Sequence, residues 1–236
     1  MAGALGLRHG GRLPVAEPLA GGALAHVSLP TMQRYSLTFI VVVLLLFALA
    51  GCSREPQLSP LADDAVILAF GDSLTYGTGA AAELSYPAVL EQLSGRRVIN
   101  AGVPGEETTA GLERLAATLD EHQPQLLLLC LGGNDMLRKR DVATIMRNLE
   151  EMVAISRAQG VPVVLLGVPR PAIFGLESAP LYYELAERLQ LPLEAEAIPD
   201  VLGDNDLKSD PIHPNAAGYR QIAEGIYRKL RASGAL

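Results

Sequence analysis

The stretch AFGDSLTYG, residues 69–77, decides the fold of this chain. It overlaps the apolar run VILAF, residues 66–70, whose length and composition are typical of a strand buried on both faces of a parallel sheet. The chain leaves this run through Gly71, Asp72 and Ser73. Two interpretations follow: Ser73 caps a helix after an ordinary turn, or the turn presents its hydroxyl to a substrate.

Short apolar runs alternate with longer amphipathic stretches along the rest of the chain. The expected strands cover 65–70, 97–101, 126–131, 162–168 and, with a weaker pattern, 192–195. The expected helices cover 84–94, 108–122, 141–159, 179–190 and 215–232. This alternation predicts an α/β fold of three layers, in which helices cover both faces of a parallel sheet. We expect a single such domain over residues 65–236.

The first 64 residues are interpreted as a leader and a tether. Residues 1–31 show no sustained period and are interpreted as a mis-called N-terminal extension before a true start at Met32. Residues 32–51 combine one early arginine with a long apolar core and small residues, which predicts a lipoprotein signal peptide. Residues 52–64 are polar with two prolines and are expected to form a lipidated tether.

The end of the leader indicates a lipid anchor. Residues 49–52 (LAGC) resemble the bacterial lipobox, in which the cysteine, here Cys52, becomes the lipidated first residue of the mature protein. The alternative is a plain anchor helix with an incidental cysteine. The first interpretation predicts a protein held in the cell envelope by its lipid, on the periplasmic or extracytoplasmic side, and on the outer membrane where there is one.

Charge and cysteine content restrict the partners. The chain carries a net charge of −7, and the arginines of the leader make the remainder more acidic still. This charge argues against nucleic acid or anionic head groups as electrostatic partners. Only Cys52 and Cys130 are present, so no disulfide framework is expected. Cys130 lies in an apolar run and is interpreted as a small buried side chain.

A serine nucleophile needs a base, and the sequence offers one. The four histidines are His9, His26, His122 and His213. The first two leave with the leader, and His122 is interpreted as a residue that binds carbonyls at a helix end. His213 lies in the loop before the last helix, with Asp210 three residues upstream. Ser73, His213 and Asp210 are therefore candidate nucleophile, base and orienting carboxylate, although Asp210 could equally form a turn.

An ester hydrolase also needs donors for the developing oxyanion. The candidates are the backbone N–H groups of Ser73 and Gly102 and the side-chain amide of Asn134, each of which follows an expected strand. Gly102 and Asn134 could also be ordinary turn residues. Asp72 is interpreted as a structural acceptor of backbone N–H groups, and Asp135 as a brace for its loop.

Four blocks of sequence together carry a family resemblance. In order they are Gly71-Asp72-Ser73-Leu74, Gly102, Gly132-Gly133-Asn134-Asp135 and Asp210-Pro211-Ile212-His213-Pro214. They resemble the blocks of the SGNH (GDSL-type) hydrolases over residues 65 to about 230, and in detail the bacterial thioesterase I, lysophospholipase L1 and arylesterase group. The resemblance implies Ser73 as nucleophile, His213 as base supported by Asp210, and Gly102 and Asn134 as oxyanion donors. It also implies a flavodoxin-like five-stranded sheet of order 2-1-3-4-5 and chemistry without a metal or cofactor.

The expected function is hydrolysis of acyl esters or thioesters, with lysophospholipids among the candidate substrates, by a monomer. The loop 169–183 is expected to supply a substrate cleft lined by Ile173, Phe174 and Tyr182, with Leu176 and Tyr183 nearby. The alternative is that these residues only cover the sheet edge. Two other functions stay open: an O-acetyl esterase acting on carbohydrate or cell wall, and a non-catalytic lipoprotein that binds lipids.

Overall fold

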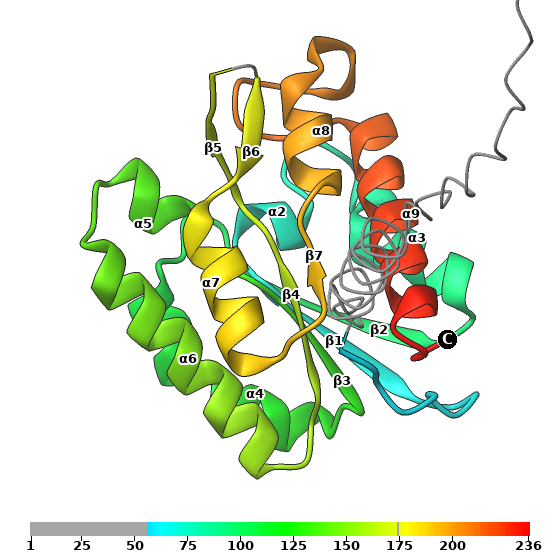
Figure 1. Cartoon of the computed structure of the whole chain (residues 1–236). Coiled ribbons are helices and arrows are strands. Elements are labelled where there is room, and N and C mark those ends of the chain that lie inside the picture. The colour runs from blue at the N-terminus through cyan, green and yellow to red at the C-terminus, as the bar shows by residue number, and fades with distance from the viewer. Residues whose placement is uncertain (1–55, 174) are drawn as a thin grey trace, which may run out of the picture. The chain divides into compact units, whose positions relative to one another are not determined.

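The computed structural model describes residues 56–173 and 175–236, which form a parallel sheet between two layers of helices (Figure 1). The sheet order is β2-β1-β3-β4-β7, and every neighbouring pair is parallel. These strands are β1 (Val66–Gly71), β2 (Arg97–Gly102), β3 (Leu126–Cys130), β4 (Val163–Leu166) and β7 (Leu193–Glu194). Counted within the sheet, this is the predicted order 2-1-3-4-5, and the predicted three-layer α/β fold is confirmed.

The helices cover both faces of the sheet (Figure 1). They are α2 (Ser73–Tyr76), α3 (Tyr86–Ser94), α4 (Thr108–His122), α5 (Gly133–Leu137), α6 (Val142–Ala158), α7 (Pro180–Leu189), α8 (Ala197–Gly203) and α9 (Ala216–Ala232), with short 3-10 turns at Ala82–Leu84 and Asn205–Leu207. α3 packs against α9 on one face, and α4 packs against α6 on the other. All five helices expected from periodicity are present within about two residues of their predicted ends.

The two central strands make the core and bring the polar loops to one edge. Every residue of β3 is fully buried, as are residues 67–70 of β1. Their continuous apolar sequences fit strands covered on both faces. In the register of the sheet, Gly71 pairs with Gly102 on one side and with Cys130 on the other. The loops after β1, β2 and β3 therefore start side by side at the carboxyl edge of the sheet.

Helix α6 shows how sequence sets these elements. Its side chains at 3.6-residue spacing are buried, namely Ile145, Leu149, Met152 and Val153. Asp141 caps the helix by accepting the Thr144 N–H at 3.1 Å, and Gly160 follows the helix with a left-handed φ of 76°. The stripe that the sequence predicts is thus confirmed as the face that packs on the sheet.

Helix α8 and the hairpin of β5 (Pro169–Pro171) and β6 (Leu176–Ser178) are absent from the predicted elements, as are the short helices α2 and α5. Helix α8 contains Pro199, but at its third residue, where the backbone N–H has no helical acceptor in any case, so the proline is tolerated. The strands β5 and β6 form a short antiparallel hairpin outside the main sheet. Prolines are compatible with such an edge strand. Helix α8 and this hairpin rise above the carboxyl edge of the sheet (Figure 1).

Several sequence predictions lie outside the described residues. They are the N-terminal extension, the signal peptide, the lipidation of Cys52, the first part of the tether and the position of Phe174. Among the residues that are described, no helix is long and apolar enough to cross a membrane.

Candidate active site

Ser73 is presented by the turn that follows β1. The strand ends at Gly71 and helix α2 begins at Ser73, so only Asp72 separates them. Asp72 caps this helix, because its Oδ1 accepts the Leu74 N–H at 3.0 Å. A Cβ at Gly71 would lie 2.3 Å from Thr75 Oγ1, so the turn requires glycine there. The sharp turn places Ser73 at the carboxyl edge of the sheet.

His213 connects Ser73 to Asp210. The distance from His213 Nε2 to Ser73 Oγ is 3.0 Å, and the distance from His213 Nδ1 to Asp210 Oδ2 is 2.7 Å. The other carboxylate oxygen of Asp210 accepts the backbone N–H groups of Ile212 and His213, both at 2.9 Å. The His213 hydrogen bond, together with these N–H groups, lowers the pKa of Asp210 below its ordinary value. The structure therefore brings together the three side chains that the sequence predicts as nucleophile, base and orienting carboxylate.

The loop that carries His213 is anchored on both sides. Before it, the Ser209 N–H donates to the His213 carbonyl at 2.9 Å. After it, Asn215 caps α9 by accepting the Gly218 N–H at 3.1 Å. Asp210 acts as a turn former and as the partner of the histidine ring, so the two interpretations left open by the sequence are both correct.

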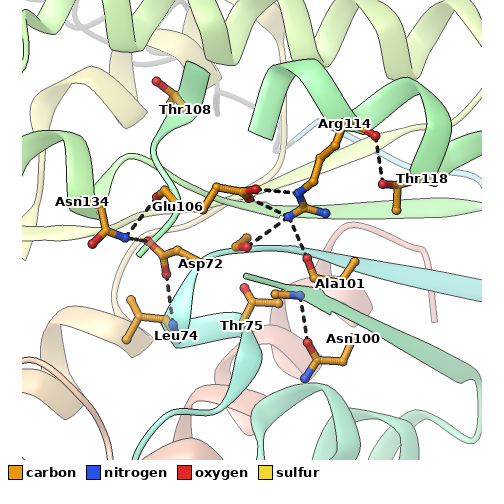
Figure 2. A network of polar contacts seen from close by, with 12 residues as sticks. Asp72, Leu74, Thr75, Asn100, Ala101, Glu106, Thr108, Arg114, Thr118 and Asn134 are labelled. Atoms are coloured by element: carbon orange, nitrogen blue, oxygen red, sulfur yellow. Dashed lines mark hydrogen bonds and ion pairs between the residues drawn. The ribbon is translucent and has the colours of Figure 1, made fainter. Parts of the chain in front are cut away.

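Asn134 lies in the first turn of α5, four residues after the end of β3. Its amide nitrogen donates to Asp72 Oδ2 at 3.2 Å and to the Glu106 carbonyl at 3.1 Å (Figure 2). Asn134 and Ser73 line the same hollow. The amide predicted as an oxyanion donor is therefore beside Ser73, and its two N–H groups are held by fixed acceptors.

The assignment of Gly102 as an oxyanion donor is wrong. Its N–H donates to the side-chain oxygen of Asn100 at 3.0 Å, and Gly102 lines a different hollow from the one at Ser73. The glycine has another reason to be there, because a Cβ would lie 2.1 Å from the Tyr76 nitrogen. Gly102 lets the end of β2 approach the α2 backbone closely.

Gly105, three residues further on, is a better candidate donor. It has a left-handed φ of 79°, and no described residue accepts its N–H. The following carbonyl, of Glu106, accepts the Asn134 amide, so this loop lies next to the amide. The Pro104-Gly105 pair is a turn signal that could have identified this position from the sequence.

Asp72 is a buried carboxyl beside the nucleophile. Only 2% of its surface is exposed. Burial raises its pKa from 3.8 to about 6, against the opposing effect of the Leu74 N–H. Its hydrogen bonds go to Leu74 and Asn134 and none goes to His213, so the structural role predicted for Asp72 is confirmed.

A solvent-open hollow of about 740 Å³ adjoins Ser73 and His213. Its lining is largely apolar and includes Leu74, Leu137, Val168, Leu176, Leu202 and Ile212. Leu176 comes from the loop that the sequence predicted, whereas Leu202 comes from the unpredicted helix α8. The hollow is a concave, mainly apolar site with a few polar side chains, among them Ser73, His213 and Arg170, as expected for an apolar ligand with one reactive group.

Two of the predicted cleft residues lie elsewhere. Tyr182 is fully buried in the core, where its hydroxyl donates to the Leu131 carbonyl at 2.7 Å. Ile173 is 93% exposed at the tip of the β5–β6 hairpin and does not line the Ser73 hollow. The helical register of α7 turns Tyr182 inward, and the hairpin carries Ile173 away from the hollow.

Sequence reasoning found Asp135 but missed Glu106 and Arg114. Asp135 accepts the N–H of Thr108 at 2.9 Å and its hydroxyl at 2.7 Å, so it braces the start of α4 as expected. Glu106 and Arg114 form an ion pair with a shortest distance of 2.6 Å (Figure 2). Their spacing crosses the end of a loop and the first turns of a helix, and no periodic pattern marks such a pair.

The fold and this geometry define a class of protein: a three-layer α/β domain with a hydrogen-bonded serine, histidine and aspartate at the strand ends. The chain belongs to the GDSL-like lipase/acylhydrolase family, whose sequence model matches residues 69–221. The match extends across Ser73, Asn134 and His213.

Known relatives agree with this assignment. The chain is 31% identical to esterase TesA of Pseudomonas aeruginosa, over 78% of this chain and 96% of the relative. It is also 31% identical to thioesterase 1/protease 1/lysophospholipase L1 of Escherichia coli K12, over 84% of this chain and 93% of the relative. A crystal structure of TesA superimposes with a TM-score of 0.64 at 30% identity, covering 71% of this chain and 99% of that one.

Proposed function

We propose that this protein is a serine hydrolase that cleaves carboxylic esters or thioesters through an acyl-enzyme. One observation carries the proposal: His213 lies 3.0 Å from the Ser73 hydroxyl and 2.7 Å from Asp210. A serine hydroxyl becomes a useful nucleophile when a base removes its proton, and the base needs a fixed orientation. The geometry supplies both.

In the proposed reaction, Ser73 Oγ attacks the acyl carbonyl carbon while its proton passes to His213 Nε2. Asp210 keeps Nδ1 of the ring protonated and stabilises the imidazolium. His213 then gives the proton to the leaving alcohol or thiol, and the acyl group stays on Ser73. A water molecule, deprotonated by His213, attacks the acyl-enzyme and releases the acid, which restores Ser73.

The oxyanion is proposed to bind three donors. The Ser73 N–H lies at the start of α2, Asn134 contributes its amide, and the Gly105 N–H replaces the one first expected from Gly102. Donors of this kind act most strongly on the charge that develops in the transition state.

The lining of the hollow supports the proposed substrate class. This apolar lining suits an acyl chain, so the proposed substrates are arylesters, acyl thioesters or lysophospholipids. Esterase and thioesterase/lysophospholipase relatives support this choice. The protein is also proposed to act as a monomer. It is proposed to lie in the cell envelope, anchored by lipid on Cys52, because residues 32–52 resemble a lipoprotein leader.

Initial rates on p-nitrophenyl esters from acetyl to dodecanoyl test the proposal. The full chain in non-ionic detergent is compared with Ser73→Ala. Rates that rise with chain length and vanish in the variant support an acyl esterase or lysophospholipase.

The other outcomes are equally informative. Activity on the acetyl ester alone favours the O-acetyl esterase. Activity that survives in Ser73→Ala overturns the mechanism, and no activity on any ester favours the lipid-binding lipoprotein.

A further inference from the structure

Arg114 joins three segments behind the nucleophile. From helix α4 it reaches the carboxyl ends of two strands and the loop between β2 and α4 (Figure 2). Its Nη2 donates to the Ala101 carbonyl at 2.9 Å and to the Gly71 carbonyl at 3.3 Å. Its Nε and Nη2 donate to the two carboxylate oxygens of Glu106, both at 2.6 Å. One guanidinium thus ties the strand end that leads into Ser73 to the loop 103–107.

The pair is placed where its geometry is fixed. The Glu106 side chain is 4% exposed and the Arg114 side chain 26% exposed. The guanidinium also lies over the Phe70 ring, 3.8 Å from its centroid. A bidentate arginine–carboxylate ion pair that is largely buried holds both side chains in one orientation.

Glu106 also binds Asn134, the proposed oxyanion donor, through its backbone carbonyl. The Glu106 carbonyl accepts one N–H of Asn134 at 3.1 Å, and Asp72 accepts at 3.2 Å from the same nitrogen. An oxyanion that takes up one of these N–H groups competes with its present acceptor. The position of Glu106 therefore affects how well the amide serves the transition state.

We propose that Arg114 is a positioning residue for the oxyanion hole and acts through Glu106 on Asn134. The proposal rests on the serine hydrolase function proposed above and extends it to a pair that touches neither substrate nor reacting atoms. An alternative is that the pair only stabilises the fold. The two roles differ in whether the effect of Arg114 depends on Asn134.

A double-mutant cycle separates them. The full-length variants are Arg114→Gln, Asn134→Ala and the double variant, with kcat, KM and melting temperature measured on one p-nitrophenyl ester. Arg114→Gln is expected to lower kcat about 10- to 100-fold with KM changed less than about threefold. In the Asn134→Ala background the further loss is expected to shrink to less than about threefold, because the group that Arg114 positions is already gone.

Two more variants complete the design. Arg114→Lys keeps the positive charge but cannot make the bidentate hydrogen bonds of the guanidinium, and it is expected to recover part of the kcat lost in Arg114→Gln. Arg188→Gln removes another arginine from a glutamate, here the surface partner Glu150, and is expected to leave kcat within about twofold. If Arg114→Gln does not fold, Arg114→Lys takes its place in the cycle.

Losses that multiply independently in the double variant overturn the proposal, as does a fall in melting temperature with unchanged kcat. If the serine hydrolase proposal itself is wrong, the result is different, because the wild-type chain then shows no activity that depends on Ser73. A wild-type chain that loses activity in Ser73→Ala, but not in Arg114→Gln or Arg114→Lys, contradicts this inference alone.

Discussion

The two halves of the site are built in opposite ways. Ser73, His213 and Asp210 form an open line in which the Asp210 side chain is 44% exposed and lies three residues from His213. The oxyanion side is a closed network in which Asp72 and Glu106 are buried and their partners come from separate loops. The first half depends on one local turn. The second depends on the packing of β1, β2 and β3 at one edge.

The two halves differ in which of their contacts must be shielded from water. Proton transfer at His213 needs only alignment with Ser73 and Asp210, which the loop 208–214 supplies through its own hydrogen bonds. Stabilisation of charge is more effective where dipoles are fixed and water is excluded. The burial of Asp72 and Glu106, and the hydrogen bonds that both accept from Asn134, fit that need.

Removing His213, the base of the open half, is expected to have the largest effect on kcat. His213→Ala is expected to lower kcat by about 10⁴-fold or more, because Ser73 loses the group that takes its proton. Initial rates on the best p-nitrophenyl ester, with circular dichroism to confirm the fold, measure this. Asp210→Ala is the matched comparison, and its loss is expected to be smaller because the base itself remains, even though the loop loses the hydrogen bonds that Asp210 accepts from Ile212 and His213. A His213→Ala enzyme with more than about a tenth of normal kcat would remove His213 from the proposed role.

The same contrast explains what the sequence could predict. Continuous apolar runs gave the central strands, and α4 was predicted at its observed ends, because burial and helical period are local properties. Ser73, His213 and Asp210 are candidates for a similar local reason, since the aspartate is close to its histidine in sequence and the serine directly follows a strand, and the family resemblance implies their roles.

The oxyanion side of the site was predicted less completely than the catalytic serine, histidine and aspartate. Gly102 ends β2 and Gly105 lies in the loop that follows, and the hydrogen bond from the Gly102 N–H to Asn100 is seen only in the structure. The Glu106–Arg114 pair becomes significant only when packing brings Gly71 and Ala101 beside it. The Pro104-Gly105 turn signal marks the loop, but the contacts that define this half are tertiary, and no period or motif in the sequence predicts them.

A pH experiment on Asp72 probes the closed half. Since its folded pKa is about 6 and its ordinary value 3.8, the folded state binds this proton more tightly than the unfolded chain does. The stability due to Asp72 is therefore fully present below pH 3.8 and is lost as the pH rises to about 6. The difference in free energy of unfolding, Asp72→Asn minus wild type, should therefore increase by about 2 to 3 kcal/mol between pH 4 and pH 8.

Urea unfolding of both proteins at several pH values between 4 and 8 measures this difference. Asp72→Asn should also lower kcat, since Asn134 then faces an amide donor in place of a carboxylate acceptor. Parallel pH curves for the two proteins would show that the Asp72 carboxyl titrates normally and that its burial does not shape this half of the site.

The smallest expected effect is that of Tyr182→Phe on stability, and it tests whether Tyr182 belongs to the core or to the substrate hollow. Tyr182→Phe removes the hydroxyl that donates to the buried Leu131 carbonyl, which should cost about 1 to 2 kcal/mol of stability and lower the melting temperature by several degrees. The preference among acetyl to dodecanoyl esters should not change, because Tyr182 lies in the core. Leu176→Ala is the contrasting variant, since Leu176 lines the hollow and its truncation should reduce kcat/KM most for long acyl chains. A shift in chain-length preference in Tyr182→Phe would return this tyrosine to the substrate cleft where the sequence first placed it.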